Sequence, residues 1–300
     1  MIDLHLHSHY SDDGEYSPLE LIEQCLAKNI NVMSITDHNC VKANIEAQIF
    51  AKSKNITLIT GIEIDCIYQD MNFHVLGYGI DFQSDDFGNI EKNIANQNFK
   101  ASLERLEKTQ ILGFSITEND MWNISKDNYW QDSWIGEMFA EVILAKPEYN
   151  DHPLLKPYRT NGLRGDNPYV NFYWDFYSQG KYCYVKIDYP PMEQIIDIIH
   201  RNNGIAILAH PGMNIKNKEF LLYEIINLGI DGLEAFSSYH APIVSDFYYQ
   251  KAFDNKLIIT CGSDYHGKTK PSIRIGSHNC FVSDEILLNQ FLSFKKRKLV

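Results

Sequence analysis

The chain has 300 residues and a net charge of −12, which is enough length for one large α/β domain or for a barrel that carries an inserted subdomain. The acidic balance argues against a surface that binds long nucleic acid or an anionic membrane, because both require a basic footprint. A phosphorylated substrate is still compatible with this charge where metal ions supply local positive charge. We therefore expect neither long nucleic acid nor a membrane among the partners.

The six cysteines are scattered along the chain and form no C-x-x-C pair. This spacing matches neither a zinc finger nor a compact disulfide framework, and it favours a reducing compartment. The first predicted strand begins at residue 2, which leaves no room for a signal peptide, and no apolar run approaches the length of a membrane span. We therefore expect a cytoplasmic protein.

Predicted strands and helices alternate up to about residue 90. The segment "IDLHL" predicts a strand, and Ser17, Pro18 and Glu20 form a capping box that predicts a helix start. Strands are predicted in "NVMSITDH", "TLITGIEI" and "FHVLGYGI", with a helix over 41–54. Late in the chain, strands in "GIAILAH", "GLEAF" and "LIITCGSD" alternate with helices over 219–228, 242–255 and from about 284. This alternation predicts a parallel sheet covered by helices.

The middle of the chain has a different composition. A helix predicted from about residue 90 to 112 is followed by a segment that holds all four tryptophans. We predict that residues 95–185 form a mainly helical, aromatic-rich subdomain, inserted into a domain made of residues 1–94 and 186–300. Its aromatic side chains form either a small separate core or a cap that stacks a base or another ring over an active site.

The stretch "DLHLHSHYSDDG" places three histidines at alternate positions and two aspartates just beyond them. Because strand side chains alternate between faces, His5, His7 and His9 point one way and Leu4 and Leu6 the other. A single histidine on a strand is usually structural, whereas several imidazoles on one face indicate a metal site.

Residues that can bind metals lie at the ends of most predicted strands, where barrel enzymes place their catalytic side chains. They occur in the motifs "DLHLHSHYSDDG", "TDH", "GIE", "FH", "AHPG", "GLE" and "GSDYH". One such residue is readily structural, but the convergence of this many predicts a metal centre.

This set of motifs, extended to "ITDHN", "GIEI", "FHVLGYGI" and "CGSDYHG", resembles the polymerase and histidinol phosphatase (PHP) family of metal-dependent phosphoesterases, and among them the nucleoside 3′,5′-bisphosphate phosphatases. The resemblance covers the chain outside the inserted region. It implies an α/β fold, a distorted (β/α)7 barrel, around a trinuclear centre that holds two or three divalent metal ions. The metal ligands that it implies are His5, His7, Asp12, His38, Glu63, His74, His210, Asp264 and His266.

Mixed histidine and carboxylate ligands suit manganese, iron or zinc. We expect Glu63 to bridge two metals, because a strand-end side chain that faces the barrel axis can reach both. Closely spaced metals lower the pKa of a bridging water, and the resulting hydroxide would attack phosphorus in line. Asp37 is expected to orient His38 or the metal-bound water without binding a metal itself.

Four further residues are candidates for contact with substrate. His240 either holds the substrate phosphate or protonates the leaving group, or it is a solvated loop residue. Arg274 follows the "SDYHG" motif, and Arg159 and Arg164 lie in the insert loop "PYRTNGLRGDNPY"; arginine suits phosphate because its guanidinium binds two oxygens at once. The family resemblance implies an arginine in the inserted helix, but "DSWIGEMFAEVIL" contains none.

We predict a phosphoesterase that removes phosphate from a small phosphorylated molecule, and the aromatic-rich insert favours a nucleotide. One alternative is a histidinol-phosphate phosphatase, whose substrate amine would need an acidic residue of the insert. Another is an exonuclease that trims short oligonucleotides. The alternative of another class is a non-catalytic metal-binding accessory domain.

Overall fold

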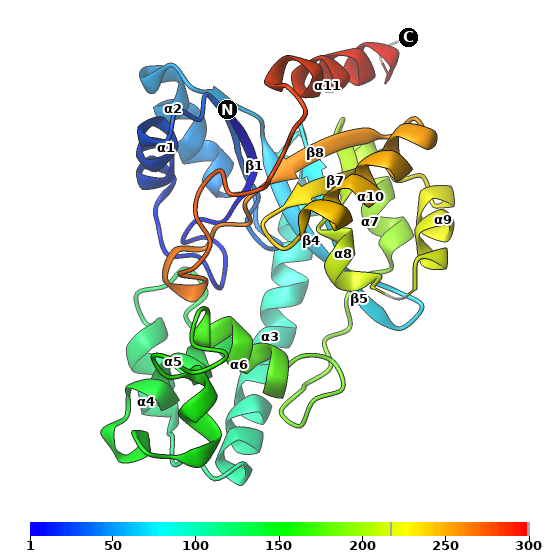
Figure 1. The fold of residues 1–300 in the computed structure, drawn as a ribbon. Coiled ribbons are helices and arrows are strands. Elements are labelled where there is room, and N and C mark those ends of the chain that lie inside the picture. Colours follow the sequence, from blue (N-terminus) through cyan, green and yellow to red (C-terminus); the bar gives the residue numbers. More distant parts are fainter. Residues whose placement is uncertain (217, 299–300) are drawn as a thin grey trace.

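The computed structural model describes residues 1–216 and 218–298, in which eight strands form two sheets flanked by helices (Figure 1). Three strands pair in the order β1-β2-β3, and five pair in the order β4-β5-β6-β7-β8. The strands are β1 (Ile2–Leu6), β2 (Val32–Ile35), β3 (Thr57–Leu58), β4 (Gly61–Tyr68), β5 (Met71–Tyr78), β6 (Ile205–Leu208), β7 (Gly232–Ser237) and β8 (Ile258–Gly262).

The two sheets meet at their edges without forming a closed barrel in the part of the chain that the structure describes. The isolated bridges Leu6–Tyr265 and His38–Glu63 link one sheet to the other, and β1 also packs beside β8. β3 has two residues, and the pairing of β1 with β2 shifts register after Asp3, so the hydrogen-bonded ladder is interrupted. The expected α/β class is confirmed, whereas the expected (β/α)7 barrel is not.

The expectation of a wholly parallel sheet is wrong at β4 and β5, which pair antiparallel. Gln69 and Asp70 connect them with φ angles of 47° and 59°, which are left-handed values typical of a two-residue hairpin turn. A parallel connection needs a dozen or more residues. β5 also pairs antiparallel with β6. The hairpin places Asp65 directly opposite His74, with consequences for the site.

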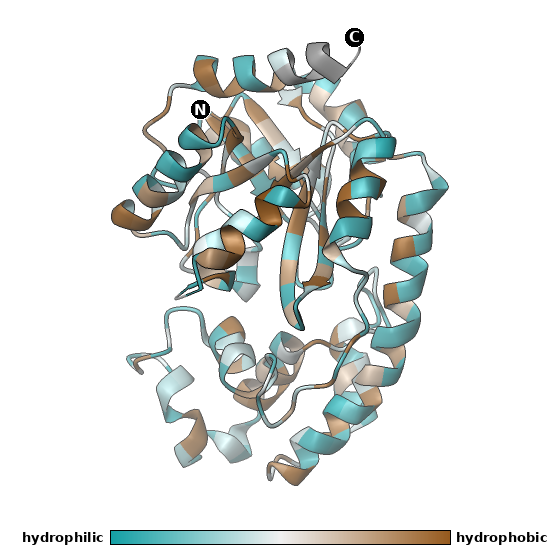
Figure 2. Cartoon of the chain, turned by 90° about the vertical axis from the view of Figure 1, so that its right-hand side faces the viewer, coloured by the Kyte–Doolittle hydropathy of each residue, from teal (hydrophilic) through white to brown (hydrophobic). Residues whose placement is uncertain are grey.

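Helices cover the outer faces of both sheets (Figures 1 and 2). The predicted capping box begins α1, because Ser17 Oγ accepts from the Glu20 N–H and the Glu20 carboxylate accepts from the Ser17 N–H. The helices are α1 (Pro18–Ala27), α2 (Ala43–Lys54), α3 (Asp85–Ile111), α4 (Glu118–Ser125), α5 (Gly136–Ala145), α6 (Pro168–Phe176), α7 (Met192–Arg201), α8 (Pro211–Asn214), α9 (Phe220–Asn227), α10 (Pro242–Asp254) and α11 (Asp284–Lys298), with 3₁₀ turns η1 (Pro147–Tyr149), η2 (Pro153–Tyr158) and η3 (Gly267–Thr269). Across the described ranges, no helix has both the length and the hydropathy to cross a bilayer.

The middle of the chain packs around a hydrophobic cluster of its own. This cluster runs from Leu106 to Cys183 and includes Trp134. The long helix α3 extends from the sheets to this region, where α4, α5 and α6 gather (Figure 1). Because α3 is continuous across residue 95 and Ala101 still packs in the cluster of the sheets, the division at residues 95 and 185 stays a prediction.

Candidate metal centre

The first strand delivers two histidines to the centre of the molecule. His5 and His7 lie on one face of the chain with their Nε2 atoms 3.1 Å apart, while Leu4 and Leu6 are buried on the other face. This is the arrangement that strand alternation predicts. Beyond His7 the chain turns back sharply, and a Cβ on Gly14 would lie only 2.0 Å from the Ser8 carbonyl oxygen.

Glu63 of β4 is the hub of the site and is fully buried. Its Oε2 atom lies 3.1 to 3.4 Å from ring nitrogens of His5, His7 and His38. Its Oε1 atom lies 2.9 to 3.1 Å from ring nitrogens of His74 and His210. Burial alone would raise the pKa of Glu63, but the neighbouring histidines, His5 foremost, hold it well below its ordinary value. The two oxygens therefore face two different sets of nitrogen donors.

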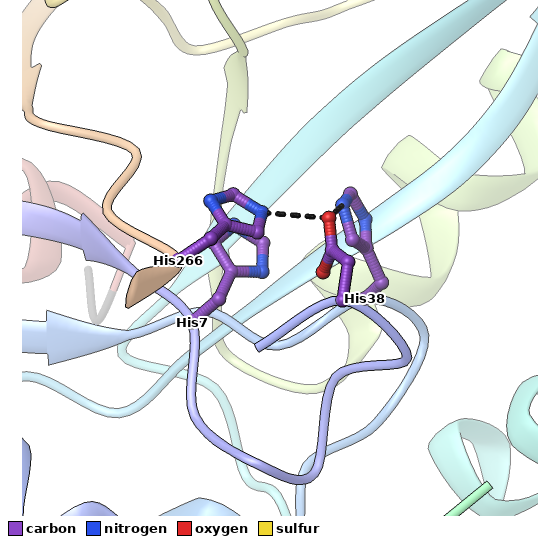
Figure 3. Close-up of side chains that lie close together, drawn as sticks. His7, His38 and His266 are labelled. Carbon is purple, nitrogen blue, oxygen red and sulfur yellow. Dashed lines mark ion pairs between the residues drawn. The ribbon is translucent and has the colours of Figure 1, made fainter. Parts of the chain in front are cut away.

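Four groups of donor atoms surround Glu63, and within each group the atoms lie within 4.8 Å of one another. Figure 3 shows three of the imidazoles converging. The groups are His5, His7, Glu63 and Asp264; Glu63, His74 and His210; His7, Asp13, His38 and His266; and His38, Asp65 and His74. Eight of the nine expected metal ligands are thus brought together.

The donor set fits divalent metal ions. Asp264 Oδ1 lies 3.0 Å from Nε2 of both His5 and His7, and His38 Nδ1 lies 3.4 Å from Glu63 Oε2. Neither buried atom makes a well-aligned hydrogen bond, and a bound cation would satisfy both. His210 and Asp264 adopt φ angles of 25° and 56°, a backbone strain that non-glycine residues accept mainly at functional sites. Imidazole nitrogens mixed with carboxylate oxygens are donors that manganese, iron and zinc accept.

The ninth expected ligand, Asp12, belongs to no such group within residues 1–216 and 218–298. Its neighbour Asp13 occupies that place, with Oδ2 at 2.9 Å from His266 Nε2 and 3.9 Å from His38 Nε2. Burial and then the charge of Asp13 raise the pKa of Asp12 to about 8. Asp65, which the sequence analysis did not select, lies 3.0 Å from His74 Nε2. The position of Asp65 opposite His74 on the hairpin is the feature from which it could have been predicted.

Other side chains hold the histidine rings in place. The His5 Nδ1–H donates to Glu234 Oε1 at 2.8 Å, and the same carboxylate accepts from the His210 backbone N–H at 2.7 Å. Asp37 accepts hydrogen bonds from the backbone N–H and the hydroxyl of Ser8 at 2.6 and 2.7 Å, so it fixes the loop after β1 and does not orient the His38 ring. Its alternative role toward a metal-bound water stays a prediction.

His240 is not placed to serve substrate. Its Nδ1 donates to the Ala235 carbonyl oxygen at 3.0 Å, and its Nε2 accepts from the Gly212 N–H at 3.1 Å. The side chain is buried, and burial lowers its pKa. Both ring nitrogens of His240 are bonded to the backbone, so this side chain fixes the turn that follows His210. It is therefore neither the substrate contact nor the solvated loop residue that the sequence predicted.

The three candidate arginines are also used within the protein. Arg159 donates to the carbonyl oxygens of Leu144 and Tyr149, Arg164 pairs with Asp175 at 3.0 Å, and Arg274 donates to the Pro271 carbonyl oxygen at 2.7 Å. None of the three lines the cavity over the metal ligands in the part of the chain that is described. The expected phosphate contacts of the cap loop are therefore not supported.

Two other cations line that cavity. Arg105 projects from α3, and Lys270 lies with its Nζ 2.8 Å from Asp264 Oδ2 and 3.3 Å from His266 Nε2. The cavity has a volume of about 290 Å³ and is bounded on the insert side by aromatic side chains. Arg105 was not predicted, because the expected phosphate contacts were placed on the insert loop and on the helical segment 132–144 before it, and not on α3.

A model of the PHP domain family matches residues 3–257 of this chain. The chain belongs to the PHP family. A 5′-3′ exoribonuclease of Haemophilus influenzae is 26% identical over 267 residues, which are 88% of this chain and 89% of that protein. A 3′,5′-nucleoside bisphosphate phosphatase of Chromobacterium violaceum is 26% identical over 269 residues, which are 88% of this chain and 87% of that protein.

Two further proteins are similar to this chain over most of their length. A phosphoribosyl 1,2-cyclic phosphate 1,2-diphosphodiesterase of Eggerthella lenta is 22% identical over 268 residues, 89% of this chain and 94% of that protein. The crystal structure of a candidate metal-dependent phosphoesterase from Bifidobacterium adolescentis shares the fold, with a TM-score of 0.78 and 22% identity over 97% of this chain and 95% of that one. The predicted PHP family and the predicted enzyme class, a metal-dependent phosphoesterase, are confirmed by these matches.

Proposed function

We propose that this PHP protein removes phosphate from a small phosphorylated molecule and that this molecule is a nucleotide. The observation that carries the proposal is the cavity in which the metal-ligand groups face aromatic residues of the insert. Manganese, iron or zinc ions held by the groups around Glu63 would supply positive charge to the phosphoryl oxygens and lower the pKa of water. The two separately facing oxygens of Glu63 support its expected role as a bridge between ions.

Arg105 and Lys270 are proposed to bind the substrate phosphate. They are the only arginine and lysine among the described residues that line this cavity. Lys270 lies against Asp264, so its ammonium stabilises charge on the group to be transferred. Arg105 is held by one bond from Nη1 to the Trp134 carbonyl oxygen at 3.1 Å, and a guanidinium has five N–H donors in all. It can therefore bind a second phosphate group or an ester oxygen.

The aromatic wall of the cavity supports a nucleotide as substrate. A planar base stacks on aromatic side chains with a gain of about 1–3 kcal/mol per base. The residues that supply this wall are Tyr173, Trp174, Tyr177, Tyr184 and Tyr189. A cavity of about 290 Å³ is close to the lower end of the range for small-molecule sites. It would accept a mononucleotide.

An acidic cavity beside the first one argues against a long RNA substrate. It has a volume of about 600 Å³ and shares Asp12, Asp13 and Glu137 with the site. Its lysine, Lys268, is paired with Glu141 at 2.9 Å. A phosphodiester strand that left the site on this side would meet carboxylates, which repel it. Glu137 at the shared boundary also supports a second candidate, histidinol phosphate, because a carboxylate can bind its amine.

The test of this function is phosphate release by manganese-reconstituted protein. The panel holds nucleoside 3′,5′-bisphosphates, mononucleotides, histidinol phosphate and short oligoribonucleotides, and Asp264→Ala is the inactive control. We expect release to be fastest from one nucleotide class. Fastest release from histidinol phosphate would favour the second candidate. Fastest degradation of oligoribonucleotides, or no release from any compound, would contradict the proposal.

Asp13 rather than Asp12 is expected to bind metal. Replacing Asp13 by asparagine removes a charged oxygen that lies 2.9 Å from His266 Nε2, and we expect the affinity for Mn²⁺ to fall at least about tenfold. The matched variant Asp12→Asn changes a carboxyl group one residue away, which its pKa of about 8 leaves largely protonated at neutral pH, and it should change the affinity less. Calorimetric titration of the metal-free proteins with Mn²⁺ measures both. An equal or larger loss of Mn²⁺ affinity in Asp12→Asn would show that Asp12, the residue expected from the sequence, binds the metal.

A further inference from the structure

A second cluster of metal-binding side chains lies where the chain between η3 and α11 passes β8. The donor atoms of Cys261, His278 and Cys280 lie within 4.8 Å of one another. Gly262 faces His5 and Glu234 in the phosphoesterase site. Because side chains alternate along a strand, Cys261 points to the opposite face of β8. The cluster is therefore separate from the groups around Glu63.

His278 is oriented as a metal ligand. Its Nε2 lies 2.8 Å from the carbonyl oxygen of Ile2, which can only accept, so Nε2 carries the proton. The lone pair is thus on Nδ1, which accepts a weak hydrogen bond from the Cys280 backbone N–H at 3.3 Å, and a metal ion would replace this bond. Histidines that bind metals usually donate the other ring N–H to a carbonyl oxygen or a carboxylate, which fixes the ring. The Ile2 carbonyl serves that purpose here.

The two thiols make long hydrogen bonds to backbone carbonyl oxygens, and they differ in exposure to solvent. Cys261 Sγ lies 3.9 Å from the Ile2 carbonyl oxygen, and Cys280 Sγ lies 3.7 Å from that of Val282. Cys261 and His278 are buried, whereas Cys280 is half-buried, so an ion can approach from its side.

We propose that Cys261, His278 and Cys280 form a second metal site that binds zinc. Two thiolates and one imidazole are a typical zinc donor set, and a water completes the tetrahedron. The site would join β8, the segment before α11 and, through the Ile2 carbonyl, the start of β1. Binding to ligands that only the folded chain brings together adds to the free energy of folding. We therefore expect zinc to stabilise the fold from a site that is separate from the groups around Glu63 and whose fourth position stays open to water.

Cobalt substitution tests the site separately from the active site. Thiolate ligands give Co²⁺ an intense charge-transfer absorption in the near ultraviolet, whereas the ligands around Glu63 offer only nitrogen and oxygen. When Co²⁺ is titrated into reduced, metal-free protein, the ions also fill the groups around Glu63, so we expect this absorption to saturate at the amplitude of one thiolate-bound ion per chain after more than one equivalent has been added. It should disappear in Cys280→Ser and in Cys261→Ala and persist in Cys25→Ala, which removes a buried thiol of α1. Zinc should also raise the Tm of the wild type more than that of Cys280→Ser.

Three results would overturn the proposal. The first is a wild-type protein that lacks the thiolate absorption. The second is an absorption that persists in both cysteine variants. The third is a Cys261–Cys280 disulfide, detected by mass spectrometry in air, in a protein whose reduced form binds Co²⁺ without that absorption. This third result would assign the pair to thiol–disulfide chemistry instead. Because Cys280 is half-buried, its serine variant tests the proposal even if Cys261→Ala does not fold.

Discussion

Replacement of Glu63 by glutamine is expected to lower kcat by about 10³-fold or more and to reduce the bound metal. The variant keeps the size of the side chain but removes the charge that five imidazoles face at 2.9 to 3.4 Å. Metal ions supply several kcal/mol of transition-state stabilisation, and each 1.36 kcal/mol is tenfold in rate. Phosphate release and metal content per chain are the two measurements.

The control for this variant is Glu224→Gln. Glu224 accepts from Tyr68 and Gln69 at the tip of the same hairpin, at 3.1 and 2.6 Å, and takes no part in the ligand groups around Glu63. It should keep both metal and activity. A Glu63→Gln protein that holds a full complement of metal and hydrolyses phosphate at the normal rate would show that the carboxylate does not bridge metals.

Replacement of Arg105 by methionine is expected to lower kcat/KM by about 10–100-fold. Methionine fills similar space but removes the guanidinium, and a hydrogen bond to a charged group is worth about 1.5–3 kcal/mol. If Arg105 binds a phosphate that does not react, most of the loss falls on KM. If it stabilises the group being transferred, the loss falls on kcat. Initial rates over a range of substrate concentrations separate the two cases.

Arg164→Met and Arg274→Met are the matched controls. Arg164 is paired with Asp175, and Arg274 is bound to the Pro271 carbonyl oxygen, away from the cavity. Both variants should keep the KM of the wild type within a factor of about two. If KM rises strongly in either control and does not rise in Arg105→Met, then phosphate is bound by the arginines predicted from the sequence and not by Arg105.

The chemistry of the centre followed from the sequence because it depends on residue types and on local geometry. His5 and His7 share a face since the side chains of a strand alternate, and that period holds within any strand. Glu63, His210 and Asp264 stood out because each ends or follows a predicted strand. Parallel pairing of β6, β7 and β8 brings His210 and Asp264 to one edge, whereas Glu63 lies near the start of β4 and is held there by its bridge to His38. The capping box at Ser17 is equally local, and α1 begins there.

The turn between β4 and β5 shows where local signals fail. Gln69 and Asp70 adopt left-handed φ angles, but this pair lacks the glycine that marks a two-residue hairpin in a sequence. The antiparallel pairing, and with it the place of Asp65 opposite His74, was therefore not predicted.

The sequence by itself determined the family, the α/β class and nearly all of the side chains that gather around Glu63. Only the tertiary structure decided that Asp13 rather than Asp12 faces His266, that His240 is bound to backbone on both nitrogens, and that Arg105 reaches the cavity. The physical reason is that strand alternation ends with the strand. Beyond it, the direction of a side chain depends on the path of the loop and on packing between segments far apart in the chain, and no local pattern of residues records either.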